Sequence, residues 1–378
     1  MSEYQYYEFQ AIDRSLTAKE MSELRSYSSR ARITPTSFVV DYAWGTFKGD
    51  EDAWMEKYFD AFLYLANWGT RVLKLRLPSR LLDAGAAKAY CGGDSAFVRA
   101  KSGKVIVSFV SEDEGGGEWI DGEGHLSSLI SVRAELARGD LRALYLGWLL
   151  RAQTGELDDD DTEPPVPPGL GQLTGPLEGL AEFLRIDQDL LYVAAEASPP
   201  MAEARLDRNE VRRWVGKLPA KEKDVLIADL MVDADQAHIA ELLQKFLKEQ
   251  AGTDGTKATG RTVGQLLRAA DDYSVERERL EAEKRAKEKA RREREAAILR
   301  QKYLDSLAGI EPKLWAEVEC LVSSKQPKSY DQAVRILVDL RDLAARGEGG
   351  DFGLRKEALR QNHARKPSFI ERLRKVGL

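Results

Sequence analysis

The stretch Tyr4–Ile12, YQYYEFQAI, opens the region that decides the fold, because its aromatic residues favour a β-strand. A capping box at Thr17-Ala-Lys-Glu20 follows and predicts that a helix starts there. Apolar patterning then predicts strands at 32–42 and 45–48, a helix over 50–66 and a strand at 71–77. The resulting order, β-α-β-(β)-α-β over residues 3–78, is that of a ferredoxin-like split βαβ unit.

Further elements extend this region to residue 153. A helix is predicted over 79–90, and strands at 96–101 and 104–110 flank Ser102-Gly103, which suits a hairpin turn. Two helices follow, near 126–137 and 140–153. The second is apolar on nearly all sides, so we expect it inside a core. Residues 1–153 are therefore predicted to form one α+β domain.

The segment Glu156–Pro168, ELDDDDTEPPVPP, interrupts this pattern with six acidic residues and four prolines. Such a composition offers little apolar surface to bury, so a solvated linker is predicted over residues 154–175. Apolar stripes at helical spacing then predict a small helical bundle over 176–250. Glycine and threonine predict a flexible linker over 251–260.

A long charged helix is predicted over residues 261–307. Large apolar residues are almost absent between Tyr273 and Ile298, so the apolar positions that a coiled coil needs are missing. Opposite charges four residues apart instead support a single solvated helix that acts as a spacer. Three pairs have the favourable order and two the reverse: Glu281/Arg285, Glu283/Lys287 and Glu288/Arg292, then Arg277/Glu281 and Lys289/Glu293.

Apolar stripes return over residues 308–378, where two antiparallel helical hairpins are predicted. The chain as a whole is therefore predicted to be α+β. Its N-terminal ferredoxin-like unit carries an added hairpin and helices, and the remainder is mainly helical.

Composition predicts a globular protein in the cytoplasm. Hydrophobic residues make up 43% of the 378 residues, which is enough to build cores. The longest strongly apolar stretch, Ala143–Leu150, is far shorter than the roughly 20 residues of a membrane span. The N-terminus has no basic flank followed by an apolar run, so no secretory signal is predicted. Cys91 and Cys320 need no disulfide, which fits a reducing compartment.

The sequence shows no grouping of residues typical of a catalytic or metal site. His125, His238 and His363 are scattered and far from the two cysteines, so no zinc site is predicted. Phosphate-binding-loop and nucleophile-elbow motifs are absent. Glu112–Glu114 could bind a metal, as in nuclease chemistry, but they lead into the loop Gly115–Gly117, whose mobility argues against it. We therefore predict no cofactor, no metal and no enzymatic activity.

Charge is distributed unevenly along the chain. Residues 1–200 carry 20 Lys/Arg against 32 Asp/Glu, whereas residues 201–378 carry 37 against 31. The C-terminal part is therefore the part that would attract phosphate backbones. The candidate nucleic-acid contacts are basic residues of the tail, namely Arg355, Arg360, Arg365, Lys366, Arg372, Arg374 and Lys375.

Two stretches resemble known bacterial proteins. The sequence YDQAVRILVDLRDL from Tyr330, together with HARKP from His363 and LRKVGL from Leu373, resembles the helical tail of bacterial SWIM zinc-finger proteins. The SWIM motif itself, with paired cysteines and a Cys-x-His, is absent, so zinc binding is not implied. The opening, YYEFQAIDR from Tyr6 and ARITPTSF from Ala31, resembles a widespread uncharacterised bacterial family. These resemblances imply a bacterial, cytoplasmic setting.

The favoured prediction is a non-enzymatic adaptor or scaffold in a multi-protein complex, because spacers and helical hairpins supply reach and surface. Its C-terminal helices are predicted to dock a protein partner through Trp315, Tyr330, Leu337 and Phe369. One alternative is a nucleic-acid-associated protein that uses the basic tail beside a helicase or SWIM-type protein. The other is an enzyme of unknown class. The sequence leaves the oligomeric state open.

Overall fold

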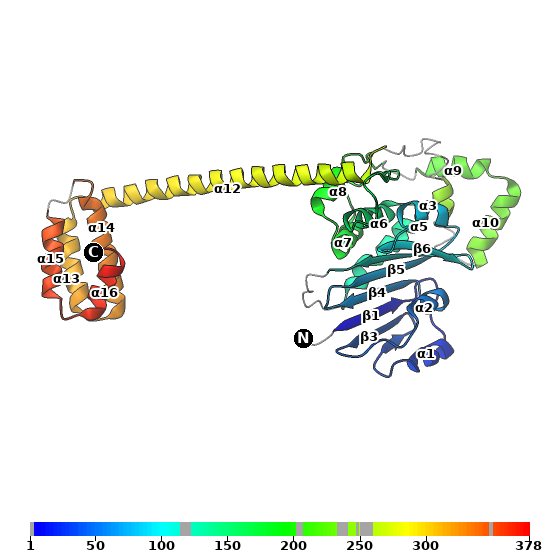
Figure 1. Ribbon diagram of the computed structural model, residues 1–378, viewed down its shortest axis with the longest axis horizontal. Helices are drawn as coiled ribbons and strands as arrows, with labels where there is room; N and C mark the ends of the chain where they lie inside the picture. The colour runs from blue at the N-terminus through cyan, green and yellow to red at the C-terminus, as the bar shows by residue number, and fades with distance from the viewer. Residues whose placement is uncertain are drawn as a thin grey trace. The chain divides into compact units, whose positions relative to one another are not determined.

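The computed structural model describes residues 4–113, 122–201, 207–232, 241–246, 249, 260–347 and 351–378. The chain forms two compact units, Met1–Glu276 and Arg277–Leu378. The first contains an antiparallel sheet with helices and the second is helical, as the ribbon in Figure 1 shows. The predicted α+β class with a mainly helical C-terminal part is confirmed. No helix among the described residues combines the length and apolarity needed to cross a membrane.

Within the described residues, seven strands form one sheet in the order β2-β3-β1-β4-β5-β7-β6, and neighbouring strands are antiparallel. The strands are β1 (Gln5–Gln10), β2 (Arg32–Thr34), β3 (Ser37–Tyr42), β4 (Ala61–Ala66), β5 (Arg71–Pro78), β6 (Ala96–Lys101) and β7 (Lys104–Ser111). Helix α1 (Ala18–Arg25) joins β1 to β2, and α2 (Glu51–Lys57) joins β3 to β4. The order β2-β3-β1-β4 with these two helices is the ferredoxin-like arrangement that the sequence predicts.

Some element boundaries differ from the prediction. The helix predicted over 50–66 ends at Lys57, and Ala61–Ala66 is the central strand β4. Phe62 and Leu63 belong to the cores on opposite faces of the sheet. A short run that is apolar on both sides does not distinguish a buried strand from a helix, which explains the error. Residues 45–48 form a loop rather than a strand, and 32–42 form two strands, β2 and β3.

Both faces of the sheet are buried. An aromatic core that includes Phe9 and Trp54 lies between one face and the helices α1 and α2. Seven of the described helices contribute to the core on the other face: α3 (Ala84–Tyr90), α4 (His125–Leu129), α5 (Ser131–Ala137), α6 (Arg142–Gln153), α7 (Gly175–Phe183), α8 (Gln188–Ala195) and the first turns of α12 (Val263–Leu307). Nearly every residue of α6 is buried, which confirms its predicted interior position.

The acidic, proline-rich segment does not form the predicted solvated linker. Asp158–Asp161 are exposed, but Glu163 is 1% exposed and Val166 2%. The Glu163 carboxylate accepts hydrogen bonds from the hydroxyl of Tyr145 and from Arg261, whose Nη2 lies 2.7 Å from Oε1. Its charge is therefore compensated inside the unit. Composition alone suggests that this segment is solvated, because it does not show that Glu163 has a partner, Arg261, almost a hundred residues later in the chain.

The predicted boundary at residue 154 is also not where the chain divides. Helices α7 and α8 share the core of the sheet, so they belong to the first unit rather than to a separate bundle. Helices α9 (Arg208–Lys217) and α10 (Ala220–Val232) follow, and Gln244 donates hydrogen bonds to the carbonyls of Leu81 and Ala137. Most of the predicted linker 251–260 lies outside the described residues.

Helix α12 (Val263–Leu307) is one continuous helix of 45 residues, which confirms the predicted long helix. All five predicted charge pairs of its middle part form ion pairs. Helices α13 (Glu311–Ser323), α14 (Pro327–Ala344), α15 (Phe352–Asn362) and α16 (Pro367–Lys375) complete the second unit. A separate hydrophobic core holds these four helices together.

Candidate protein-interaction site

The side chains predicted to contact a protein partner are core residues. Tyr330 is 7% exposed, and Leu337 and Phe369 are fully buried between α14 and α16. Trp315 is half-buried and packs against Phe352, with ring centroids 5.8 Å apart. Three of the four residues therefore hold the second unit together and have no surface to offer a partner. The prediction failed because an apolar stripe identifies a face to be buried but does not say what buries it.

The second unit has an open groove along α14, with a volume of about 680 Å³. Its apolar lining comes from Val334, Ile336 and Val338 of α14, Tyr303 of α12 and Val376 after α16. Ile336 and Val338 flank the buried stripe of α14 and are only half-buried. The signal for this groove in the sequence is that these apolar residues fall beside the stripe rather than on it.

Charged residues border the groove. Arg300 pairs with Asp339 at 2.5 Å and with Asp342 at 2.7 Å, and the Tyr303 hydroxyl donates to Asp339 at 3.1 Å. Burial raises the pKa of Asp342, but hydrogen bonds from Arg300 and from Arg341 outweigh it and hold that pKa below its usual value. These contacts hold the charged side chains at the rim of the groove, that is, its border, in place.

Two other rim residues, Arg335 and Glu317, have no ion pair with any residue that the structure describes. The groove therefore combines an apolar floor, a fixed pair of charges and two charges that can meet a partner. The described lining contains no cysteine or histidine. Across the described chain, no three or more His, Cys, Asp or Glu side chains are grouped so as to hold a metal ion. An open groove with an apolar floor is a surface on which another chain can pack.

The basic residues of the tail divide into two groups. Arg372 pairs with Asp331 at 2.7 Å, Lys375 pairs with Glu371 at 3.1 Å, and Lys366 donates to the Val322 carbonyl at 2.7 Å. The other four have no ion pair within the described residues, and they are Arg355, Arg360, Arg365 and Arg374. These four remain available to a polyanion, although they come from two helices and the turn between them.

The other polar candidates lie apart from one another. Asp113 lies 3.9 Å from Arg185 in an ion pair, and Glu114 is outside the described residues, as is His238. His363 lies 2.8 Å from Glu319. Burial raises the pKa of the Cys91 thiol to about 12, so this cysteine is inert at neutral pH.

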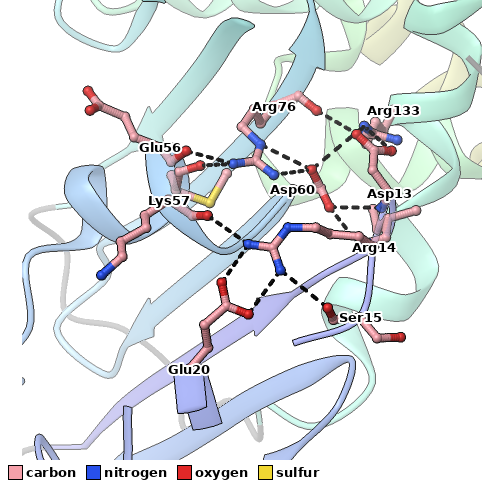
Figure 2. Close-up of polar contacts among 11 residues, drawn as sticks. Asp13, Arg14, Ser15, Glu20, Glu56, Lys57, Asp60, Arg76 and Arg133 are labelled. Carbon is pink, nitrogen blue, oxygen red and sulfur yellow. Dashed lines mark hydrogen bonds and ion pairs between the residues drawn. The ribbon is translucent and has the colours of Figure 1, made fainter. Parts of the chain in front are cut away.

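A dense polar cluster surrounds Asp60 in the first unit (Figure 2), and no pattern in the sequence predicts it. Asp60 has no exposed surface, and its carboxylate accepts hydrogen bonds from Nε and Nη2 of Arg76 at 3.0 and 2.6 Å. The backbone N–H groups of Ile12 and Asp13 donate to the other oxygen at 2.7 and 2.9 Å. Arg133 links the cluster to α5 by donating to both carboxylate oxygens of Asp13 at 2.7 Å.

Such a cluster of perturbed groups can mark an active site, but here its hydrogen-bonding capacity is used internally. Nη1 of Arg76 donates to the carbonyls of Met55 and Glu56, at 2.7 and 2.9 Å. Nε of Arg133 donates to the carbonyl of Arg76 at 2.7 Å. Few donors remain for a ligand, so the cluster ties β1, β4, β5, α2 and α5 together and serves stability.

Comparison of the chain with protein families, curated proteins and solved structures finds no match. The resemblance of the C-terminal residues to the tail of SWIM zinc-finger proteins stays a prediction. The surfaces of the two units are therefore the basis for assigning a role.

Proposed function

We propose that the protein is a non-enzymatic adaptor whose C-terminal unit docks a protein partner in the groove along α14. The observation that supports this proposal is the groove itself, with its half-buried Ile336 and Val338 and the unpaired charge of Arg335. Half-buried apolar side chains beside an open hollow are what an amphipathic helix covers when it lies in a groove. A partner would bury these residues and exclude water from the Arg300–Asp339 pair.

The partner is expected to present an acidic, amphipathic helix. Residues 277–378 carry 25 Lys/Arg against 17 Asp/Glu, so the unit that contains the groove has a net positive charge. Opposite charge on a partner speeds encounter and orients it, while its apolar side chains supply most of the binding energy. An acidic residue of the partner would meet Arg335.

Site-specific photo-cross-linking of the full chain in its native host tests this proposal. A photoreactive residue is placed at Gln332, which is exposed and lines the groove, and for comparison at Leu354, which is 75% exposed on α15. The expected result is a protein adduct at position 332 that survives nuclease treatment. The substitution Arg335→Glu should weaken it.

The adduct must also be specific to the groove. Equal adducts at both positions, or no protein adduct at 332, would contradict the proposal. An adduct that disappears on nuclease treatment would point to a nucleic-acid role instead. Circular dichroism of each variant verifies that the helices are intact.

A nucleic-acid role is the second candidate, and the four unpaired arginines of the tail favour it. Binding through phosphates should weaken steeply with salt, with a slope of about 0.9 per contact for duplex DNA. A gel shift across a salt series, with Arg365→Glu/Arg374→Glu as the test variant, measures this. Absence of binding by the full chain at low salt would eliminate the candidate.

A further inference from the structure

A second groove, in the first unit, lies between α7 and α8 and has a volume of about 680 Å³. Its floor is apolar, with Leu170, Ala181 and Ile186 buried, while Leu191 is half-buried at its side. Tyr192 is 50% exposed and stacks on Tyr273, with ring centroids 4.2 Å apart and the planes 13° from parallel. A ring supported on one face in this way is a rigid anchor for a partner, because little conformational freedom is lost on binding.

Two carboxylates, Glu178 and Glu182, stand on the α7 side of this groove. Both side chains are exposed, they are four residues apart on one helix, and neither has an ion pair within the described chain. Like charges at this spacing repel and lower helix stability by about 0.2–0.5 kcal/mol. The nearby Arg185 does not relieve them, because it pairs with Asp113 and donates to the Ser111 hydroxyl at 3.1 Å.

An exposed tryptophan lies in a turn near the C-terminal end of α7. Trp68 is 44% exposed in the turn between β4 and β5. The neighbouring Gly69 packs tightly against the backbone of Asp113, which is the partner of Arg185. Arg71, just after this turn, donates to the carbonyls of Glu182 and Phe183 at the end of α7. The turn that carries Trp68 therefore lies near the end of α7, and exposed tryptophan is typical of binding hot spots.

We infer that this groove docks a basic amphipathic helix of a partner protein. The apolar face of that helix would cover Ile186, Leu191 and Tyr192, while two of its lysines or arginines meet Glu178 and Glu182. Carboxylates one helical turn apart match cations one turn apart on a helix, which a small ligand would not supply. Residues 1–276 carry 32 Lys/Arg against 46 Asp/Glu, so this unit repels nucleic acids and anionic membranes.

This site goes beyond the proposed function and does not depend on it. The groove along α14 is expected to receive an acidic helix, and the groove between α7 and α8 a basic one. An adaptor with both would bind two partners of opposite charge. Variants of one groove should leave the other unaffected, so either assignment can fail alone.

The test measures binding of the full chain to a fluorescein-labelled model helix of about 14 residues, near the shortest length that is marginally helical alone. This peptide has leucines on one face and lysines on the other. A counterpart with glutamate in place of lysine and a scrambled leucine/lysine peptide of the same composition are measured beside it. Fluorescence anisotropy at low salt reports the affinity.

The variant Glu178→Lys/Glu182→Lys should weaken binding of the lysine peptide at least about tenfold, because attraction becomes repulsion. Trp68→Ala should weaken it less. The matched control, Asp160→Lys/Asp224→Lys, changes two exposed acids elsewhere in the unit by the same charge and should bind as the wild type does. Arg335→Glu, in the other groove, should also have no effect.

Several results would overturn the inference. One is that the lysine peptide does not bind, or binds no better than the scrambled peptide, which would mean unspecific attraction between charges. Another is that the glutamate peptide binds equally well. A third is that the control double variant weakens binding as much as the variant within the groove.

Discussion

Ion pairs occur in this chain in two contrasting settings, around Asp60 in the first unit and along the exposed part of α12. Asp60 has no exposed surface, and Arg76 together with two backbone N–H groups surrounds its carboxylate. Glu281 lies between Arg277 and Arg285, 3.2 Å from each, and its side chain is 44% exposed. In the first setting the partners replace water around a buried charge, whereas in the second they compete with water. The same chemistry should therefore contribute very differently to stability.

The largest effect is expected from Asp60→Asn. The substitution keeps the shape but leaves the buried guanidinium of Arg76 without its carboxylate. Removal of one partner of a buried ion pair lowers the free energy of unfolding by about 3–5 kcal/mol. Urea unfolding followed by tryptophan fluorescence measures the loss. Asp41→Asn, at an exposed position of β3, is the control and should change little. A loss below 1 kcal/mol for Asp60→Asn would show that the cluster can rearrange.

A smaller loss is expected from Arg133→Met. Its guanidinium donates to Asp13 and to the carbonyl of Arg76, and its side chain is 12% exposed. The substitution removes charge-assisted hydrogen bonds that are worth about 1.5–3 kcal/mol in comparable settings. Arg133→Met should cost less in the Asp13→Asn background than in the wild type, because the charged partner of the guanidinium is already gone. Additive losses would mean that the contact contributes nothing.

The contrast between the two settings also explains which ion pairs the sequence could reveal. Helix geometry places residues four apart on one face, so the pairs of α12 follow from spacing alone. Asp60 lies just before β4 and its partner Arg76 lies in β5, while Glu163 meets Arg261 across 98 residues. Contacts of this kind depend on the fold and leave no periodic signal.

The same reasoning applies to the fold and the candidate sites. The ferredoxin-like order was predictable, because most of its elements have strong patterns and a capping box. The strand β4 was not, since a run buried on both faces has neither the period of a strand nor that of a helix. The groove along α14 was not predicted, because the apolar stripe with Tyr330, Leu337 and Phe369 suggested the binding surface. These residues form the core of the second unit, and the groove lies beside the stripe. Which side of a helix meets its neighbours is decided only in three dimensions.

The pH dependence of stability should also distinguish the buried cluster from the exposed ion pairs. Burial raises the pKa of Asp60, but the charge of Arg76 and the backbone N–H groups outweigh it and hold that pKa below its usual value. A carboxyl of this kind stabilises the fold fully above its unfolded pKa of about 3.9, and the contribution is lost as pH falls through the lower folded pKa.

Protonation of Asp13 affects stability in the opposite direction to protonation of Asp60. Burial raises its pKa despite the charge of Arg133, and the charge of Asp60 adds to the rise. Its ionised form therefore costs stability at neutral pH, and protonation relieves that cost at a pH above the point where Asp60 titrates.

The free energy of unfolding should fall below about pH 4 in the wild type and less steeply in Asp60→Asn. Equal slopes in a urea series at several pH values would rule out Asp60 as the source.

The smallest effect is expected from Glu281→Gln, which removes both ion pairs of this residue on α12. Each i,i+4 pair contributes about 0.2–0.5 kcal/mol, and Arg277–Glu281 has the less favourable order, so the loss should stay below about 1 kcal/mol. Glu283→Gln, which breaks only the pair with Lys287, is the matched comparison and should lose about half as much. Thermal unfolding followed at 222 nm measures both. In 1 M salt the Debye length shrinks to about 3 Å, so both losses should vanish. The loss caused by Asp60→Asn should remain, because the partners of Asp60 are buried and salt ions cannot reach them. A loss for Glu281→Gln that persists in high salt would mean that this residue has a buried role, and the contrast between the two settings would not hold.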